Sequence, residues 1–235
     1  MKILIIIPAY NEASILKENI LEVFNFCQSN LTINWQIVIA DNKSVDQTLV
    51  IGKELADKYQ QVEYLYVDQK GKGAAISAGW QKYQADIYCF MDADLATKLS
   101  ALPELISGFL QGYDIVIGSR FHKQSKVQRS LVRKLFSLGY RLVIRILLGL
   151  KVKDLPCGFK AINSEIKANI LPKVEDKEWF FDSELVILAE KRGYKIKEIP
   201  VIWSEPRNKN NKSRVKVISL SLAYFRKVWQ LRKKL

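Results

Sequence analysis

The stretch Ile87-Tyr88-Cys89-Phe90-Met91-Asp92-Ala93-Asp94 decides how this chain can be organised. Its apolar part predicts a buried strand that ends on two carboxylates, Asp92 and Asp94. Residues two apart on a strand point to the same side, so both carboxylates are expected beyond its carboxyl end, where open α/β sheets bind ligands. A hard divalent cation would relieve their mutual repulsion and also grip a phosphate. The alternative is a strand that ends in an ordinary polar turn.

The rest of the N-terminal half repeats this order of apolar strand, polar loop and helix. Strands are expected at residues 3–7, 35–40, 62–67 and 87–91, with helices at about 14–27, 47–59 and 74–83. The alternation predicts a doubly wound α/β sheet whose loops converge on one edge. Further on, we expect strands at 114–117 and 196–203, helices at 103–111, 128–150, 164–171 and 183–192, and a loop or short strand at 153–160.

Composition narrows the class of protein. The chain has 235 residues and is 49% apolar, which excludes a mainly disordered protein. We expect no membrane-spanning helix, because no apolar run reaches 18 residues, and no secretory signal, because the N-terminal apolar run is too short. Three scattered cysteines favour a reducing cytosol. A single histidine, His122, argues against zinc and leaves Mg²⁺ or Mn²⁺ on carboxylates as the better expectation.

The net charge of +13 is concentrated in two segments. Residues 115–153 and residues 206–235 each hold ten Lys or Arg and no acidic residue, whereas the rest of the chain has more acidic than basic residues. This distribution predicts an anionic partner at particular surfaces. Nucleic acid and anionic lipid are both candidates, and a basic nucleic-acid-binding module is therefore one hypothesis.

Two further loops have a functional and a structural interpretation. The loop Gln69-Lys70-Gly71-Lys72-Gly73-Ala74 could bring backbone N–H groups to a phosphate, or it could be a plain strand-to-helix turn. Asp41, after the second expected strand, could accept hydrogen bonds from a nucleobase or ribose, or it could cap a helix.

Taken in order, these motifs resemble family-2 glycosyltransferases of the GT-A fold. The first part of the match is Ile7-Pro8-Ala9-Tyr10-Asn11-Glu12, Asp41 with Ser44-Val45-Asp46, Gly71-Lys72-Gly73 and Asp92-Ala93-Asp94. The second part is Gly118-Ser119-Arg120, Asp154-Leu155-Pro156-Cys157-Gly158-Phe159-Lys160, Trp179-Phe180-Phe181-Asp182-Ser183-Glu184 and Ile199-Pro200-Val201-Ile202-Trp203. With these motifs the chain is similar to the polyprenyl-phosphate sugar synthases, most of all to their dolichyl-phosphate glucosyltransferase branch. The implied fold is a mixed, mostly parallel Rossmann-like sheet flanked by helices.

The resemblance implies a role for each matching residue. The residues that would bind the donor are Pro8, Tyr10, Glu12, Asp41, Lys72 and Asp92, together with Arg207, Ser213 and Arg214 on a closing loop. Asp92 and Asp94 would bind the metal. The acceptor phosphate would be bound by Arg120, Arg129, Ser130 and Arg133. Asp94, Asp182 and Arg120 are the implied catalytic residues, with Asp182 near the sugar. Two positions depart from relatives: Ala96 stands where mannosyl enzymes carry a Gln, and the closing loop lacks a glycine.

The implied reaction is an inverting transfer of a hexose from a sugar nucleotide to a polyprenyl or dolichyl phosphate. Glucose from UDP-glucose is the first expectation, and mannose from GDP-mannose is the alternative. A soluble or glycan acceptor is a third possibility, which the basic amphipathic helices disfavour. Because the nucleophile is a phosphate monoester that is ionised at neutral pH, it needs positioning more than a strong base.

The basic segment 128–150 predicts an amphipathic helix. Leu131, Leu135, Leu138, Leu142 and Ile146 recur at helical spacing, with Lys and Arg beside them. This pattern is typical of a helix in a membrane interface, and equally of a surface helix packed on the core. We expect a peripheral protein on the cytoplasmic side of a membrane with anionic lipid, and no nucleic acid. The functional division expected is 1–118 for the donor, 119–206 for the acceptor and 207–235 for a closing loop and basic helix.

Overall fold

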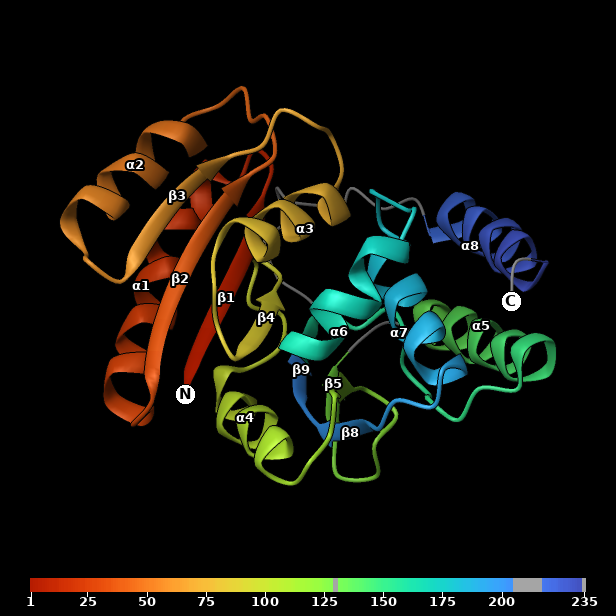
Figure 1. Cartoon of the computed structure of the whole chain (residues 1–235). Helices are drawn as coiled ribbons and strands as arrows, with labels where there is room; N and C mark the ends of the chain where they lie inside the picture. Colours follow the sequence, from red (N-terminus) through yellow and green to blue (C-terminus); the bar gives the residue numbers. More distant parts are fainter. Residues whose placement is uncertain (129–130, 205–216, 234–235) are drawn as a thin grey trace.

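A single mixed sheet forms the centre of the molecule (Figure 1). The computed structural model describes residues 1–128, 131–204 and 217–233. Within these residues the strand order is β3-β2-β1-β4-β7-β5-β8, and only β7 runs antiparallel to its neighbours. The strands are β1 (Lys2–Ala9), β2 (Asn34–Asp41), β3 (Val62–Tyr66), β4 (Ile87–Met91), β5 (Ile115–Ser119), β7 (Phe159–Asn163) and β8 (Ile196–Pro200). The expected mixed, mostly parallel α/β sheet is confirmed.

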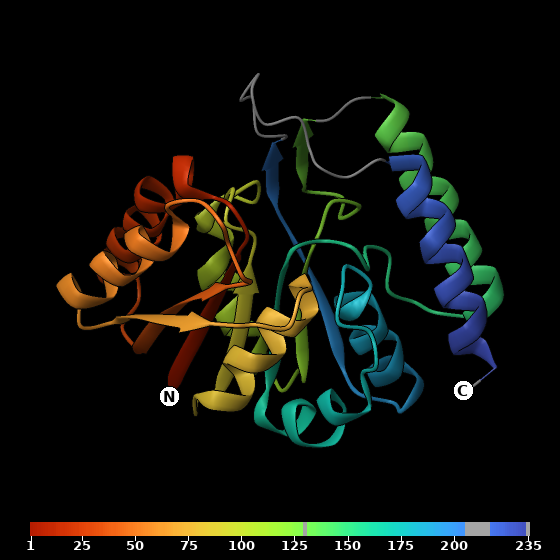
Figure 2. The same cartoon turned by 90° about the horizontal axis from the view of Figure 1, so that it is seen from above.

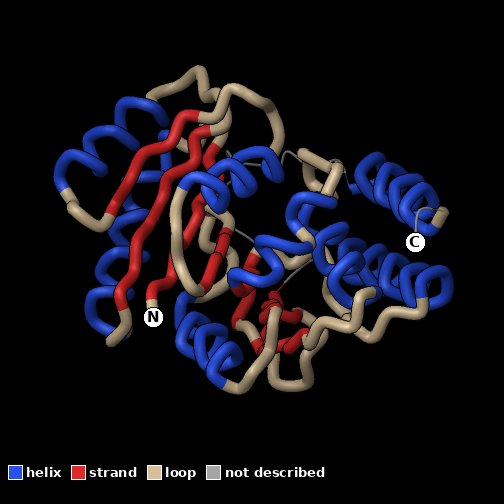
Figure 3. Tube along the Cα trace, in the orientation of Figure 1, coloured by secondary structure: helices blue, strands red, loops and turns tan. Residues whose placement is uncertain are grey.

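Helices cover both faces of this sheet (Figure 3). They are α1 (Ala13–Asn30), α2 (Thr48–Lys58), α3 (Lys72–Lys82), α4 (Leu102–Leu110), α5 (Leu131–Leu148), α6 (Ser164–Asn169), α7 (Phe181–Lys191) and α8 (Val217–Arg232), with short 3-10 turns at Leu99–Ala101 and Leu171–Lys173. Side chains alternate along each strand, so β1 packs Ile3 and Ile5 toward α1 and packs Leu4 and Ile6 toward α3. The chain thus buries two apolar clusters, one on each face.

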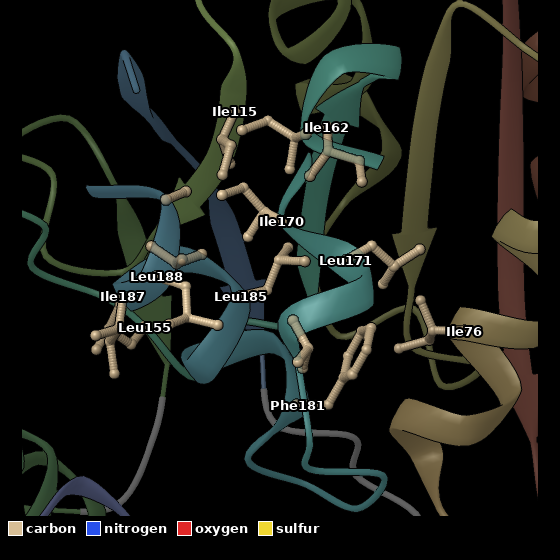
Figure 4. Close-up of a cluster of buried hydrophobic side chains, with 14 of the residues drawn as sticks. Ile76, Ile115, Leu155, Ile162, Ile170, Leu171, Phe181, Leu185, Ile187 and Leu188 are labelled. Carbon is tan, nitrogen blue, oxygen red and sulfur yellow. The ribbon is translucent and has the colours of Figure 1, made fainter. Parts of the chain in front are cut away.

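One of these clusters packs helix α7 against strands β5 and β7 in the C-terminal half of the protein (Figure 4). Ile115 of β5 and Ile162 of β7 meet Leu185 and Leu188 of α7, and all four side chains are buried. Phe181, at the first turn of α7, reaches toward Ile76 of α3 in the same cluster. Full burial of such side chains contributes roughly 1.5–3 kcal/mol each. Helix α7 is therefore fixed against the sheet, and its N-terminus is held beside α3.

Helices α5 and α8 lie side by side at the end of the molecule that is far from β3 (Figure 2). Ile144 and Leu148 of α5 and Val228 and Leu231 of α8 are buried in the same cluster as α7. The two amphipathic elements expected in the C-terminal half are therefore present as helices, and each packs one face on the protein. The functional division at residue 118 stays a prediction, because that position falls inside β5 and one sheet runs through both parts.

Two elements differ from the expectation. The loop expected at 153–160 ends at Gly158, and a short strand, β7, extends beyond it over Phe159–Asn163 and pairs Lys160 with Phe90 of β4. Its buried lysine breaks the apolar pattern that would have revealed it. The strand expected at 196–203 is split, because its last part, β9 (Ile202–Ser204), leaves the main sheet and pairs with β6 (Lys126–Gln128).

Candidate active site

The candidate site lies at the carboxyl edge of the parallel strands, where the loops after β1, β2 and β4 meet. Each of these loops contains one non-glycine residue with a positive φ: Asn11 at 53°, Lys43 at 61° and Leu95 at 47°. This region of backbone conformation is uncommon for residues with a side chain, and it clusters at functional sites. Among the residues that the structure describes, this uncommon backbone conformation is thus concentrated beside the expected donor site.

The loops after β1 and β2 are tied together by hydrogen bonds. The Asn11 amide donates to Ser44 Oγ at 2.9 Å, and Asn11 Oδ1 accepts from the Val45 amide at 2.8 Å. The Glu12 amide donates to Thr48 Oγ1 at 2.9 Å. These bonds fix the segment that holds Tyr10, whose side chain is 42% exposed at this edge. Of the expected donor residues, Tyr10 and Glu12 therefore lie in one braced loop, and Pro8 lies within β1 just before it.

Asp41 is fully buried at the end of β2. Its Oδ1 accepts from the Ser44 amide at 2.9 Å, and its Oδ2 accepts from the Tyr64 hydroxyl at 2.7 Å. Burial, followed by the hydrogen bond to Asp41, raises the pKa of Tyr64. Asp41 therefore closes a turn rather than capping a helix. Because Asp41 has no exposed surface and both of its oxygens already accept hydrogen bonds from the protein, its contact with a nucleoside stays a prediction.

Lys72 and Asp92 form an ion pair at the centre of the site. The Lys72 ammonium lies 2.5 Å from Asp92 Oδ1 and over two aromatic rings, 5.2 Å from the Phe90 centroid and 5.3 Å from that of Trp179. Burial lowers the pKa of Lys72, but the charges of Asp92 and Asp182 outweigh it and raise the pKa on balance. The lysine is therefore charged, and it is held beside the carboxylate that is expected to bind metal and diphosphate.

Asp94 stands next to this pair with its side chain open to solvent. The surrounding protein reduces its hydration, and this together with repulsion from Asp92 raises the pKa of Asp94 to about 6. One oxygen accepts from the Ala96 amide at 3.1 Å. Asp92 and Asp94 therefore do lie together and influence each other's charge, as two carboxylates that share a cation would.

The position of the Asp92 carboxylate depends on the absence of a side chain at Gly158. The Asp92 amide donates to the Gly158 carbonyl at 3.2 Å, and a Cβ on Gly158 would lie 1.9 Å from Asp92 Oδ2. Any side chain at position 158 would thus displace the carboxylate. The sequence indicated Gly158 only as part of a motif, and the reason for its presence appears in the packing.

Beneath Phe90, Lys160 and Asp182 form a second ion pair. Their charged atoms are 2.7 Å apart, and Lys160 also donates to the Cys157 carbonyl. The Lys160 ammonium lies 5.6 Å from the Phe90 centroid, on the ring that Lys72 also contacts. The charges of Asp92 and Asp182 both act on Lys72, so Asp182 lies close to the carboxylate site, and its place near the sugar stays a prediction. Lys160 was not among the expected site residues, because its partner is 22 positions away in sequence.

Arg120 is held by a buried carboxylate. Its Nε and Nη2 donate to the two oxygens of Asp154 at 2.8 and 2.6 Å, and its amide donates to the same side chain. Burial lowers the pKa of Arg120, but the charges of Asp154 and, more weakly, Asp92 raise it on balance. A guanidinium has five N–H donors, so three remain for a phosphate.

The other residues expected to bind the phosphates cannot be placed in the site. Arg129, Ser130, Arg207, Ser213 and Arg214 lie outside the described residues, and Arg133 lies in α5 with its side chain outside the description. Of the residues expected to bind the acceptor phosphate, Arg120 is the one whose side chain the structure describes.

The glycine loop differs from a phosphate cradle. The Gly71 amide donates to Asn42 Oδ1 at 2.7 Å, and the amides of Gly73 and Ala74 donate to the carbonyls of Glu178 and Lys177 at 3.1 and 2.9 Å. These donors are already used by protein acceptors. The loop is thus a braced strand-to-helix turn whose role is to present Lys72.

The carboxylate pair suits a hard cation that brings further ligands with it. Among residues 1–128, 131–204 and 217–233 there is no group of three His, Cys, Asp or Glu side chains that could hold a metal. Two carboxylates alone leave several positions on Mg²⁺ or Mn²⁺ for water and phosphate oxygens, as is usual for Mg²⁺ at diphosphate sites. Asp92 and Asp94 are therefore the residues that would hold such an ion.

Helix α5 presents apolar side chains to solvent. Leu138, Leu142 and Ile146, one turn apart, are 41%, 58% and 71% exposed, and Trp229 of α8 is 52% exposed. Over the described part of the chain, no helix is long and apolar enough to cross a membrane. The opposite side of α5, with Ile144 and Leu148, packs on the protein, and contact of the exposed side with a membrane stays a prediction.

Comparison with known proteins identifies the family. Residues 4–171 match Glycosyl transferase family 2. The chain belongs to this family. It is 32% identical to the dolichyl-phosphate beta-glucosyltransferase ALG5C of Trichomonas vaginalis, over 85% of this chain and 63% of that protein. It is also 32% identical to the dolichol-phosphate mannosyltransferase of Pyrococcus furiosus, over 99% of this chain and 64% of that protein. The chain thus spans slightly less than two thirds of the length of both relatives.

Solved structures show the same fold. Glucosyl-3-phosphoglycerate synthase from Mycobacterium tuberculosis, solved with Mn²⁺, UDP and glucosyl-3-phosphoglycerate, superposes with a TM-score of 0.71. The match covers 97% of this chain and 79% of that one at 17% identity. The expected GT-A fold of family-2 glycosyltransferases is confirmed. A basic nucleic-acid-binding module, the alternative from another class of protein, finds no support in the family assignment.

Proposed function

We propose that this family-2 glycosyltransferase transfers glucose from UDP-glucose to a polyprenyl phosphate, such as dolichyl phosphate, with inversion at the anomeric carbon. One observation carries the proposal: Asp92 forms an ion pair with a charged lysine, Lys72, beside a second carboxylate, Asp94, and its charge also acts on an oriented arginine, Arg120. The carboxylates suit a metal-bound diphosphate, and the cations suit the anionic groups of the donor and the acceptor. The similarity to dolichyl-phosphate beta-glucosyltransferases supports the choice of sugar and acceptor.

The transfer makes one bond and breaks one. An oxygen of the lipid phosphate bonds to the anomeric carbon while the bond from that carbon to the diphosphate breaks, and a nucleoside diphosphate leaves. Because attack comes from the face opposite to the leaving group, an α-linked donor gives a β-linked product. A divalent ion on Asp92 and Asp94 would supply charge neutralisation for the diphosphate.

The chain's own residues would position both reactants. Lys72, held between Phe90 and Trp179, places a positive charge where the diphosphate develops negative charge. Asp154 fixes the plane of the Arg120 guanidinium, so its remaining donors can meet the oxygens of the acceptor phosphate. The lipid phosphate is already ionised at neutral pH, so the site needs orientation and exclusion of water rather than a strong base. Asp182 would lie near the sugar.

The same proposal places the protein on a membrane. The exposed side chains Leu138, Leu142 and Ile146 would enter the interface, and Arg145, also exposed on α5, would meet anionic headgroups. Such charges gain roughly 1 kcal/mol each near anionic lipid. The cytoplasmic face is proposed because that leaflet carries anionic lipid and the three cysteines are free and buried.

A specific observation favours a second candidate. The Pyrococcus furiosus dolichol-phosphate mannosyltransferase matches 99% of this chain, so mannose from GDP-mannose to the same type of acceptor is the alternative. The two candidates share the carboxylate site and differ in the donor.

A transfer assay separates these candidates. Purified protein receives a short-chain polyprenyl phosphate, Mn²⁺ or Mg²⁺, and either UDP-glucose or GDP-mannose. We expect a metal-dependent glucosyl lipid with wild type and with Asp57→Asn, a matched exposed carboxylate on α2, but not with Asp94→Asn. A mannosyl lipid instead would establish the alternative. Donor binding without any transfer to lipid would refute the lipid acceptor.

A further inference from the structure

Helix α8 contacts the loop before α7, whose last residues, Trp179 and Phe180, belong to a matching motif but were given no role. This loop, residues 174–180, runs from the short turn Leu171–Lys173 to α7. The Tyr224 hydroxyl donates to the Trp179 carbonyl at 2.5 Å, and the Tyr224 ring meets Phe180 edge-on at 5.4 Å between centroids. One turn further along α8, Lys227 forms an ion pair with Asp176. Two side chains of α8, Tyr224 and Lys227, thus fasten the 174–180 loop to this helix.

The opposite side of the same loop holds the glycine turn before α3. The carbonyls of Lys177 and Glu178 accept from the amides of Ala74 and Gly73. The fit is tight, because a Cβ on Gly71 would lie 2.0 Å from the Lys177 carbonyl oxygen. Gly71 itself has a φ of 128°, which residues with a side chain rarely adopt. The turn that presents Lys72 therefore takes its position from the 174–180 loop.

Trp179 extends this contact to the carboxylate site. Its ring lies 5.3 Å from the Lys72 ammonium, which in turn lies 2.5 Å from Asp92. An aromatic face attracts a cation by about 0.5–2 kcal/mol, depending on desolvation. The backbone of Trp179 is held by α8 while its side chain covers the lysine of the donor site.

The 174–180 loop is built to transmit position rather than to bend. Glu184 Oε2 accepts from the Asp176 amide at 2.8 Å, and Asp176 Oδ1 accepts from the Glu178 amide at 2.8 Å. Asp176 thus uses its second oxygen, Oδ2, for Lys227. Internal bonds of this kind leave few ways for the loop to absorb a displacement of α8.

We infer that Tyr224 and Lys227 are positioning residues for the donor site, which act through the 174–180 loop on Lys72 and Asp92. The inference rests on the proposed function only for the identity of the ligand, a nucleoside diphosphate. Since α8 packs beside α5, the helix with the exposed apolar face, the same contacts link the donor site to whatever surface holds this helix pair (Figure 2).

Hydrogen exchange tests the physical link without any ligand. In Tyr224→Phe and in Lys227→Met, the amides of residues 71–74 should exchange about fivefold faster or more than in wild type, a factor at the lower end for coupled sites. Lys227→Arg should restore slow exchange, and Arg226→Met, which removes an exposed charge one position earlier on α8, should leave it unchanged. Unchanged exchange at 71–74, or an equal increase throughout the chain, would overturn the inference.

Affinity for UDP with Mn²⁺, measured by calorimetry in the absence of lipid, tests the functional consequence. We expect the Kd to rise about five- to tenfold in Tyr224→Phe and in Lys227→Met, and to stay at the wild-type value in Lys227→Arg and Arg226→Met. Faster exchange at 71–74 with an unaltered Kd would show that the loop does not position the donor site, and would overturn the inference. A wild type that binds no UDP would contradict the proposed donor, while the exchange experiment would still decide the link.

Discussion

The ammonium of Lys160 lies 2.7 Å from the carboxylate of Asp182, and these side chains are 0% and 7% exposed. Removal of one partner leaves an uncompensated buried charge. We therefore expect Lys160→Met to lower the free energy of unfolding by about 3–5 kcal/mol, a loss typical for a broken buried pair. Urea denaturation at pH 7 measures the effect.

A matched control and a second variant make this test specific. Lys53→Met removes an exposed lysine from α2 and should change the stability by less than about 0.5 kcal/mol. The double variant Lys160→Met/Asp182→Asn should recover part of the loss, because no charge is then left unpaired. A single Lys160→Met variant as stable as Lys53→Met would contradict the assigned pairing.

Gly158 offers a test of the carboxylate geometry. In Gly158→Ala the new Cβ would occupy the position of Asp92 Oδ2, so the carboxylate must turn away. We expect the affinity for Mn²⁺ in the presence of UDP to fall at least about tenfold, which corresponds to 1.4 kcal/mol. Calorimetry measures this affinity.

The control for this variant is Gly139→Ala in α5, where a Cβ would meet nothing within 4 Å. That change should leave Mn²⁺ affinity unaltered and stabilise the helix by about 0.5–1 kcal/mol. Equal Mn²⁺ affinities for Gly158→Ala and wild type would mean that Asp92 does not hold the ion.

Replacement of the Asp94 carboxylate by a neutral group should make the metal-free protein more stable. Its pKa is raised to about 6, so its ionised form is disfavoured in the folded state. A carboxyl group whose pKa is higher in the folded than in the unfolded protein stabilises the fold at pH values below its unfolded pKa. This stabilisation is lost as the pH rises through the folded pKa of about 6. Asp94→Asn should therefore raise the unfolding free energy at pH 7.5 by about 1 kcal/mol, a value reduced because the side chain is exposed and screened.

The pH dependence separates this effect from a general change in packing. Near pH 4 the wild-type carboxyl is mostly protonated in the folded protein, so the difference between Asp94→Asn and wild type should nearly vanish. Thermal unfolding from pH 4 to pH 8, without divalent ions, provides the comparison. A stability difference that does not depend on pH would contradict the raised pKa.

The exposed face of α5 should govern binding to membranes. Leu142→Asn and Ile146→Asn remove apolar groups that would be buried in a bilayer interface, a contribution of roughly 1.5–3 kcal/mol for each fully buried side chain. Co-sedimentation with vesicles that contain anionic lipid should show a binding constant at least about tenfold lower for each variant.

Leu110→Asn serves as the control, because Leu110 is 74% exposed on α4, away from the α5–α8 pair. Its vesicle binding should equal that of wild type. Should Leu110→Asn weaken binding as much as Leu142→Asn, a general loss of surface hydrophobicity would explain the result instead.

Local patterns were sufficient to predict most of the fold. Strands such as β1 and β4 are continuous apolar runs that end in polar loops, and the paired Asp92 and Asp94 follow from that ending. Lys160 could not be found in this way, because a lysine within a strand is understandable only beside Asp182, which arrives with α7. The contacts of Trp179 likewise depend on α8, a distant part of the chain. The sequence thus predicts which residues end at the edge of the sheet, but not which long-range partners fix them there.

The strand β7 has a consequence for the order in which the molecule assembles. It is the only strand between β4 and β5 in the described sheet, and it is synthesised after both. Strands β1 to β4 can therefore pair once residues 1–91 are free to fold, whereas β5 must wait until Phe159–Asn163 supplies its neighbour. We expect a folding intermediate with β1 to β4 formed, in which the Asp92 edge exists before Lys160 and Asp182 arrive beneath it.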